Sequence, residues 1–245
     1  MKDNFSNHSD KYAQYRPTYP VELFEFIMSQ VSNRKMAWDC GTGNGQVASQ
    51  LTNYFEQVYA SDISAQQIEH AQKHSNIIYS VQPAEKTNYP DKSFDLIVVA
   101  QAIHWFNFEK FYTEVKRTLK NDGVFVVLGY GKAYITAEID AIVEKLYNGI
   151  VGPYWDKERK YIEESYQTIP FPFQKVEAPQ FVNTLTWTFE HCVGYLKTWS
   201  AVKHFIEQRG YDPLDDIYEE LSYSWGNVAT REVNYPLLFR VGTIT

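Results

Sequence analysis

Apolar positions along the first half of this 245-residue chain follow two alternating patterns. Short segments rich in apolar residues predict strands at 36–39, 57–63, 76–82, 94–100 and 124–128, and the run at 94–100 is typical of a strand buried in a parallel sheet. Between these segments, apolar residues recur at helical spacing, as in Val47, Leu51 and Phe55 and again in Phe111, Val115 and Leu119. Strands that alternate with helices in this order predict a parallel sheet with helices on both faces.

The alternation ends after residue 130. Residues 136–150 have helical spacing, and the aromatic, proline-punctuated stretch 152–173 predicts an insertion over the ligand-binding edge of the sheet. We expect Asn121 to Gly123 to end the helix that begins at Phe108, a further helix to run to Gly210 from Val193, and another to begin at Asp212-Pro213. A last strand is expected at 233–241, where Pro236 indicates an edge or a bulge.

The most informative polar stretch is Asp39-Cys40-Gly41-Thr42-Gly43-Asn44-Gly45, directly after the first strand. Its glycines permit positive φ and close approach of a ligand, and the next helix directs free N–H groups toward the turn. A dinucleotide-binding turn has its third glycine at the position of Gln46, and the Gly-Lys-Ser/Thr ending of a phosphate-binding P-loop does not occur here. The carboxylate of Asp39 suits an ammonium group better than a pyrophosphate. A turn that needs glycines only for close packing is the alternative.

Two further polar residues follow predicted strands. Asp62 ends the second strand, where a carboxylate can accept hydrogen bonds from a ribose diol; capping of the next helix is its alternative role. His104 follows the fourth strand, at the sheet edge where open α/β folds bind ligands. It is a candidate proton acceptor or substrate hydrogen-bond donor, and the alternative is a half-buried histidine that packs on Trp105.

Composition indicates which binding partners and which cellular compartment to expect. A net charge of -7 and a pI of 5.4 argue against non-specific binding to nucleic acids or anionic membranes. The two cysteines, Cys40 and Cys192, are far apart, so we expect no metal site and a reduced, cytoplasmic setting. The polar residues 1–10 do not resemble a signal peptide, and the apolar runs are too short to span a bilayer. The aromatic share of 16% favours aromatic-lined cavities.

The order of these features resembles the class I S-adenosylmethionine-dependent methyltransferases. The resemblance covers residues 35–130 and includes the glycine turn, Asp62, the pair Ala84-Glu85 and the segment 94–105. Two further segments, 12–20 and 187–200, resemble the subgroup that is similar to trans-aconitate methyltransferase. No Asn/Asp-Pro-Pro-Tyr/Trp signature of amino-directed nucleic-acid methylation follows the fourth strand, which favours a small-molecule acceptor.

The resemblance implies a seven-stranded sheet with an antiparallel last strand, and S-adenosylmethionine as co-substrate. It assigns the ammonium of S-adenosylmethionine to Asp39, its methionine half to Gly41 and Gly43, and its ribose to Asp62. It places the adenine against Ile63 with its edge at Ala84 and Glu85, and the sulfonium side near Gln101. It assigns closure of the site to Tyr15 and Arg16, with Arg16 near the carboxylate of S-adenosylmethionine.

The length and the pattern of the chain predict one domain with four parts. These are an N-terminal lid and helix (1–34), a cofactor-binding core (35–130), the insertion (131–180) and C-terminal strands and helices (181–245). We expect in-line methyl transfer to a small molecule, by analogy a carboxylic acid, with His104 as candidate base for a hydroxyl or amine acceptor. A non-catalytic S-adenosylmethionine-binding module and a nicotinamide-dependent oxidoreductase are the alternatives. The sequence carries no signal for the oligomeric state.

Overall fold

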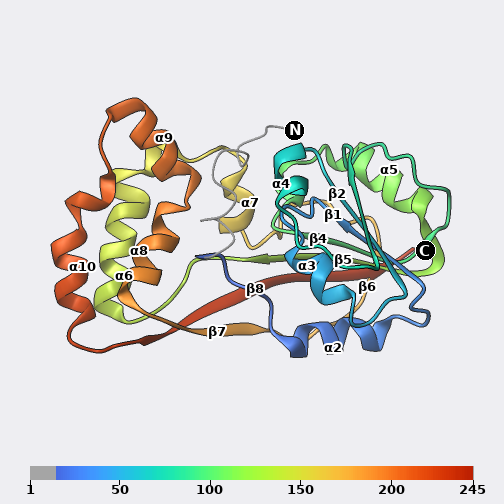
Figure 1. The fold of residues 1–245 in the computed structure, drawn as a ribbon, viewed down its shortest axis with the longest axis horizontal. Helices are drawn as coiled ribbons and strands as arrows, with labels where there is room; N and C mark the ends of the chain where they lie inside the picture. The colour runs from blue at the N-terminus through green and yellow to red at the C-terminus, as the bar shows by residue number, and fades with distance from the viewer. Residues whose placement is uncertain (1–14, 245) are drawn as a thin grey trace.

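A twisted sheet with five parallel strands forms the centre of the molecule (Figure 1). The computed structural model describes residues 15–244, so residues 1–14 of the expected lid lie outside the described residues. The parallel strands are β1 (Met36–Cys40), β2 (Gln57–Asp62), β3 (Ile77–Val81), β4 (Phe94–Ala100) and β5 (Leu119–Tyr130). The strand order is β3-β2-β1-β4-β5-β8-β6, and β8 (Arg231–Thr243) runs antiparallel to β5. The expected parallel sheet with an antiparallel last strand is confirmed.

The sheet has eight strands instead of the expected seven, because β8 is long enough to take three partners. Its second half pairs with β5 and with the short β6 (Gln174–Lys175), whereas its first half pairs with β7 (Val182–Trp187). Pro236 lies where β8 leaves β7 and meets β5. A residue without an N–H is tolerated at such a change of partner. Pro236 thus marks a change of partner instead of the expected edge or bulge.

Side chains from the central strands alternate between two apolar layers. Leu96 and Val98 pack on one face with α2 (Val21–Gln30) and α3 (Gln46–Leu51). Ile97 and Val99 pack on the other face with α5 (Phe108–Thr118) and α7 (Arg159–Glu163). This period of two is the reason that β4 is apolar from Leu96 to Ala100, since both of its faces are covered. The short α4 (Ala65–Glu69) follows β2, and η2 (Ile103–Trp105) follows β4.

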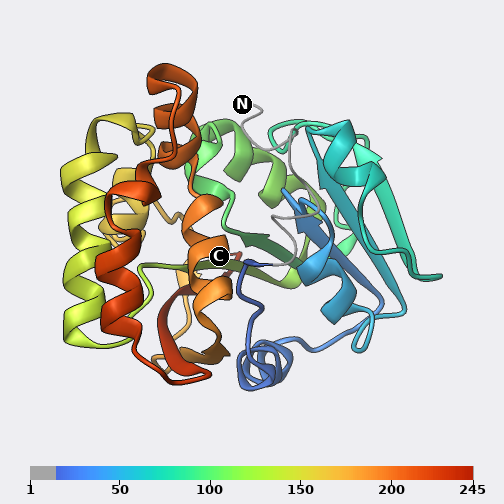
Figure 2. The same cartoon turned by 60° about the vertical axis from the view of Figure 1, so that its left-hand side comes forward.

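A third apolar cluster joins helices beyond the end of the sheet. The helix α6 (Ala137–Glu144) and its π-helical continuation η3 (Lys145–Ile150) follow β5. Three helical segments and a 3-10 turn connect β7 to β8: α8 (Phe189–Lys197), α9 (Ser200–Arg209), η5 (Pro213–Asp216) and α10 (Tyr218–Trp225). We call these segments, 137–150 and 189–225, the helical cap. Figure 2 shows its helices side by side, with the sheet behind and to one side.

Two expected element boundaries are wrong. Helix α5 ends at Thr118, because the backbone N–H groups of Lys92 and Ser93 bind its last carbonyls and the chain turns directly into β5. Residues 121–123 therefore lie within β5. The helix expected from Val193 to Gly210 is divided into α8 and α9, since Trp199 has extended backbone angles.

Asp95 connects three backbone segments at the start of β4. Its buried carboxylate accepts hydrogen bonds from the backbone N–H groups of Lys35 and Met36, at 3.0 and 2.9 Å, and from the Lys120 ammonium at 2.6 Å. We expect Asp95→Ala to lower the free energy of unfolding by about 2–4 kcal/mol, because it leaves two N–H groups and an ammonium unpaired. Lys120→Ala should cost less than about 1 kcal/mol, since Lys120 is partly exposed. Urea unfolding of both variants measures this, and equal losses would contradict the account.

Candidate active site

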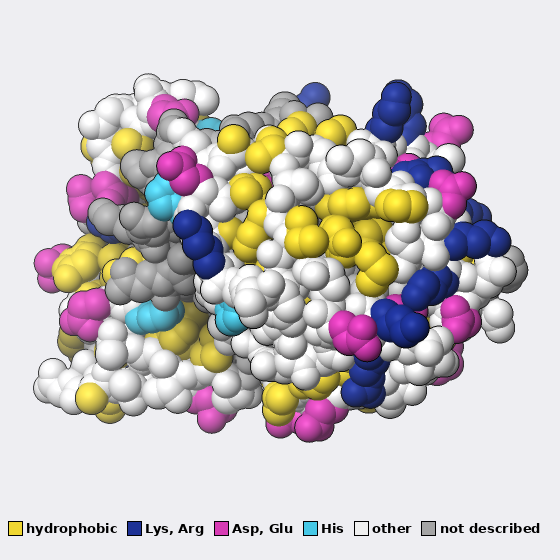
Figure 3. Space-filling view, turned by 45° about the vertical axis from the view of Figure 1, so that its right-hand side comes forward, with side chains coloured by type: hydrophobic (Ala, Val, Ile, Leu, Met, Phe, Trp, Pro, Cys, Tyr) yellow, Lys and Arg dark blue, Asp and Glu magenta, His cyan; other side chains and the backbone are white. Residues whose placement is uncertain are grey.

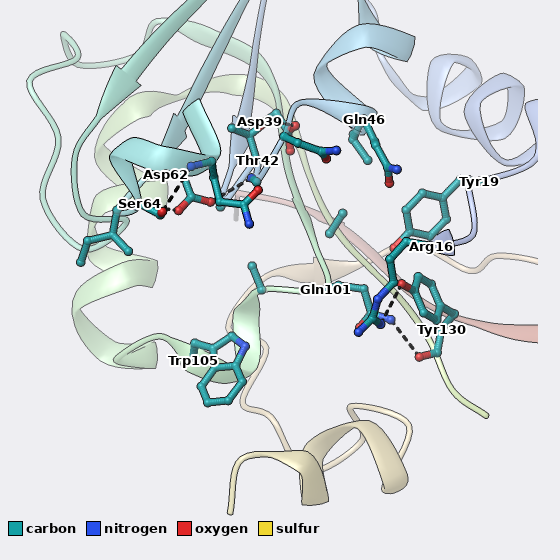
Figure 4. Close-up of a pocket in the computed structure, with 18 of the residues that line it drawn as sticks. Arg16, Tyr19, Asp39, Thr42, Gln46, Asp62, Ser64, Gln101, Trp105 and Tyr130 are labelled. Carbon is teal, nitrogen blue, oxygen red and sulfur yellow. Dashed lines mark hydrogen bonds between the residues drawn. The ribbon is translucent and has the colours of Figure 1, made fainter. Parts of the chain in front are cut away.

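A cleft opens at the carboxyl ends of β1, β2 and β4, where the strand order reverses. The space between its walls, counted to the open solvent, is about 920 Å³. Seven residues expected at the site line it: Arg16, Asp39, Gly41, Gly43, Asp62, Ile63 and Gln101. Figure 4 shows several of them converging from separate elements. The cleft is also lined by residues that sequence analysis did not assign to it, among them Tyr19, Thr42, Ser64, Gln67, Trp105 and Tyr130.

The glycine turn after β1 adopts a backbone that only glycines take without strain. Gly41, Gly43 and Gly45 have φ values of 71°, 56° and 83°. A Cβ at Gly41 would lie 2.6 Å from the Cβ of Ala102, so a glycine is needed where the turn meets the loop after β4. The backbone N–H groups of Gly41 and Thr42 donate to the carbonyl of Ser61, which attaches the turn to β2. The glycine turn, which forms the floor of the cleft, is thus held between β2 and the loop after β4.

Asp39 places a carboxylate at the bottom of the cleft, and only one of its two oxygens accepts hydrogen bonds from the described residues. Its Oδ2 accepts hydrogen bonds from the Thr42 hydroxyl at 2.5 Å and from the Ala48 N–H at 2.9 Å. Its Oδ1 is buried and has no hydrogen-bond partner among the described residues. Burial raises the pKa of Asp39 to about 7. A cationic group in the cleft would satisfy Oδ1, and this fits the ammonium of the expected co-substrate.

Asp62 connects the glycine turn to the loop after β2 (Figure 4). Its Oδ2 accepts the Gly43 N–H at 2.8 Å, and its Oδ1 accepts the Ser64 N–H at 2.9 Å. These contacts orient the carboxylate at the wall of the cleft. The ribose role of Asp62 stays a prediction, whereas its alternative role as the helix cap is wrong. Ser64, with its side chain on the Gln67 N–H, caps the helix itself.

Three of the expected residues do not line the cleft. Ala84 is buried in the apolar layer that contains α5, and the Glu85 carboxylate accepts the backbone N–H of Asn107 at 3.0 Å. The ring of Tyr15 packs edge-on against His191 of the helical cap, with a centroid distance of 5.2 Å. The roles of these residues at the adenine edge and in site closure stay predictions.

A second cavity, with an empty volume of about 520 Å³, adjoins the cleft. Arg16, Gln101 and Trp105 line both spaces. The remaining lining residues are mostly aromatic or charged: His104, Trp155, Asp156, Arg159, Ile162, Trp199 and Ser200. Trp155 and Arg159 belong to the aromatic stretch 152–173, which the sequence predicts to lie over the ligand-binding edge of the sheet. Trp199 and Ser200 reach the cavity through the fold of the helical cap, for which the sequence offers no local signal.

His104 and Gln101 define the border of the second cavity. Burial and the nearby Arg159 guanidinium lower the pKa of His104 to about 3. The ring is therefore neutral at physiological pH and too weakly basic to be an effective general base. Gln101 has a φ of 52°, which is unusual for a residue other than glycine, and its amide donates to the Tyr130 carbonyl at 2.9 Å. Such strain is concentrated at functional sites.

The described residues carry no group of His, Cys, Asp and Glu side chains arranged to hold a metal ion. Within 15–244, no helix combines the length and apolar character needed to cross a bilayer. On the face shown in Figure 3, Lys and Arg side chains gather toward one edge, with Asp and Glu among them. The expected absence of a nucleic-acid partner stays a prediction.

Comparisons with known proteins agree on one family. The family model described as "Methyltransferase domain" matches residues 38–127. A Dictyostelium discoideum protein, provisionally named a methyltransferase, is 37% identical over 243 residues, which cover 96% of this chain and 92% of that protein. A solved structure from Anaeromyxobacter dehalogenans, provisionally named a type II methyltransferase, has 38% identity and a TM-score of 0.87, covering 94% of this chain and 98% of the other. A Saccharomyces cerevisiae protein, provisionally named an S-adenosylmethionine-dependent methyltransferase, is 31% identical over 139 residues, 53% of this chain and 47% of its own length.

The raised pKa of Asp39 predicts a pH-dependent affinity for S-adenosylmethionine. A cation at Oδ1 favours the ionised carboxylate, so binding releases a proton when the free protein has Asp39 protonated. The affinity should rise between about pH 5 and pH 7, by at most about tenfold per pH unit. Titration calorimetry in buffers of different ionisation enthalpy measures both the affinity and the proton release. In Asp39→Asn the affinity should be lower and nearly independent of pH over this range; an unchanged pH profile would contradict the assignment.

The ligand-free protein should show the opposite trend in stability, which serves as a control. The pKa of Asp39 is higher in the folded state than its ordinary value of 3.8, so the folded protein binds more protons between these two values. The contribution of Asp39 to the free energy of unfolding therefore falls as pH rises toward 7 and is constant above it. Asp39→Asn should remove this fall.

Proposed function

Because the chain belongs to the class I S-adenosylmethionine-dependent methyltransferases, we propose that it methylates a small carboxylic acid bound in the second cavity. S-adenosylmethionine is its co-substrate, and its family membership sets aside the oxidoreductase and the non-catalytic module. We also propose the subgroup similar to trans-aconitate methyltransferase, supported by the motif at 12–20, of which residues 15–20 are described. A cytoplasmic setting is supported by the two free cysteines, and the absence of a nucleic-acid partner by the net charge of -7.

The observation that carries the acceptor class is the pair of guanidinium groups, Arg16 and Arg159, that line the second cavity. Arg159 lies over the Trp155 ring at 4.7 Å and donates through Nε to the Tyr147 hydroxyl at 2.7 Å. These contacts fix the direction of the side chain. Its Nη1 and Nη2 atoms make no hydrogen bond to the described residues, so a bidentate carboxylate can use both.

Arg16 relates the second cavity to the cleft. Its guanidinium donates to the Tyr130 hydroxyl and to the Thr198 carbonyl, both at 3.3 Å, and lies over the Tyr195 ring. It therefore contacts β5 and the helical cap at once. Together with Gln101 and Trp105, it borders the passage through which the two reactants must meet. A rigid border of this kind supplies the alignment on which methyl transfer depends.

The arginines and the aromatic side chains of the second cavity suit a carboxylic acid as methyl acceptor better than an amine. When bound, S-adenosylmethionine supplies a methyl group on a positively charged sulfonium. A carboxylate oxygen forms the new bond to the methyl carbon while the carbon–sulfur bond breaks, and its electron pair stays on sulfur. The two charges cancel, and no proton moves. Trp105, Trp155 and Trp199 would exclude water, which lowers the cost of this step for a charged nucleophile.

The second cavity is less suited to binding and deprotonating an amine or a hydroxyl acceptor. An ammonium would meet two arginines, although Asp156 also lines the cavity. Deprotonation would need a base with a pKa near neutrality, and burial makes His104 a weak one. The sequence-based assignment of His104 as a general base is therefore not part of this proposal.

Arg159→Met tests the proposed acceptor class, because it keeps the aliphatic bulk of the side chain and removes the charge. We expect kcat/KM for acid acceptors to fall about 10- to 100-fold, mainly through KM, since one charge-assisted interaction is lost. The affinity for S-adenosylmethionine should not change. The assay measures transfer of a labelled methyl group to a panel of small mono- and dicarboxylic acids, with base-labile esters as products.

Tyr147→Phe is the matched control. It removes the hydrogen bond to Arg159 Nε and leaves the guanidinium in place, so the loss should be smaller than in Arg159→Met. Methylation of amines or phenols, with no acid accepted and no effect of Arg159→Met, would overturn the proposal.

A further inference from the structure

A chain of hydrogen bonds leads from the backbone of β5 to the wall of the second cavity. The Gln101 amide donates to the Tyr130 carbonyl at 2.9 Å, and the Tyr166 hydroxyl donates to Gln101 Oε1 at 3.3 Å. The Tyr166 oxygen also lies 3.2 Å from His104 Nδ1. Tyr166 is fully buried, so this chain is shielded from solvent at its centre.

The chemistry of the chain allows only one direction of donation. A backbone carbonyl can only accept, so Gln101 must direct its NH₂ group at Tyr130 and its oxygen at Tyr166. The single hydroxyl proton of Tyr166 then points at Gln101, because otherwise two oxygen lone pairs would face each other. The phenol oxygen is left to accept, and His104 must supply the proton from Nδ1. The neutral imidazole consequently has its lone pair on Nε2.

Several independent contacts hold Tyr166 in place. Ser165 and Tyr166 both have positive φ, 52° and 59°, a strained backbone that persists only where its surroundings enforce it. A Cβ at Gly129 would lie 2.7 Å from the Tyr166 ring, so the glycine makes room for the ring. Arg240 donates to the backbone carbonyls of Tyr166 and Ile169, at 2.9 and 2.6 Å. The fold therefore maintains a strained segment whose hydroxyl bridges two residues of the site.

The other ring nitrogen of His104 is available to a ligand. Nε2 makes no hydrogen bond within the part of the chain that the structure describes, and His104 lines the same cavity as Arg159. Burial keeps the ring neutral, because it lowers the pKa of His104 to about 3. Nε2 therefore presents an acceptor, and no donor, at every physiological pH.

On the basis of the proposed function, we propose that the acceptor is a hydroxy acid, whose carboxylate meets the arginines and whose hydroxyl donates to His104 Nε2. His104 is then a specificity-determining residue. Tyr166 is a positioning residue that acts through His104 by fixing its tautomer. A site built to accept a hydrogen bond discriminates against analogues that lack the donor, because its own polar group would stay unpaired.

Matched pairs of acids with and without the hydroxyl test this preference: malate with succinate, and salicylate with benzoate. The readout is the ratio of kcat/KM between the members of a pair. The wild-type protein should favour the hydroxy acid by about tenfold or more in at least one pair. In His104→Phe the ratio should fall close to 1. In Tyr166→Phe it should also fall, through a higher KM for the hydroxy acid alone.

Tyr112→Phe is the control for loss of a buried tyrosine hydroxyl. Tyr112 belongs to the same apolar cluster as Tyr166, and its hydroxyl donates to the Pro170 carbonyl, outside both cavities. This variant should leave the ratio unchanged. A merely structural role of Tyr166 would lower the activity toward both members of a pair equally, and that result would overturn the proposal.

Nitrogen-15 NMR of the histidine rings provides a test that needs no acceptor. His104 should appear as the Nδ1-protonated tautomer in the wild-type protein and lose this preference in Tyr166→Phe. An Nε2-protonated ring in the wild type would overturn the inference whatever the acceptor is. If no acid is methylated, the proposed function fails and the hydroxy-acid assignment fails with it. If acids are methylated with a ratio near 1, only the further inference fails.

Discussion

The site depends on the place where the chain changes direction within the sheet. Strands β1 and β4 are paired neighbours, yet the chain leaves β1 toward β2 and leaves β4 toward β5. The loops at their carboxyl ends therefore diverge and leave a crevice, as in other open α/β sheets. Asp39, Gly41 and Gln101 lie at these strand ends. The unusual backbone angles of Gly41 and Gln101 show how sharply the chain must turn on both sides of the crevice.

A second constraint comes from the length of β8. Because this strand extends beyond β5 and continues along β7, the sheet carries the helical cap at one end. The cap has its own apolar cluster, separate from the two layers that cover the sheet. It contributes Trp199 and Ser200 to the second cavity, whereas α7 contributes Arg159. In the proposed function, the co-substrate and the acceptor therefore occupy spaces built by different parts of the fold, with Arg16, Gln101 and Trp105 between them.

The sequence predicted those parts of the site that are determined locally. The glycine turn, Asp39, Asp62 and Gln101 all stand at ends of strands, and parallel strands bring their carboxyl ends to one edge. Ala84 and Glu85 also follow a strand, but β3 lies at the far edge of the sheet, and these residues pack or cap there. Arg159 and Tyr166 lie in the aromatic stretch 152–173, which the sequence placed over the ligand-binding edge, but no local pattern singled out either residue. The bond between His104 and Tyr166 joins residues 62 positions apart, and nothing in the local pattern of either one indicates the other.

We expect the crevice between β1 and β4 to bind S-adenosylmethionine through groups that the turn has already oriented. Calorimetric titration of the ligand-free protein with S-adenosylmethionine and S-adenosylhomocysteine, repeated on Asp62→Ala, tests it most directly. Both ligands should bind the wild type with micromolar affinity. The two carboxylate contacts of Asp62 are the reason to choose this variant. We expect a loss of about 10- to 100-fold in the variant, because the ribose contact and the support of the Gly43 N–H disappear together. No heat and no thermal stabilisation with either ligand, or equal affinity in the variant, would contradict this expectation.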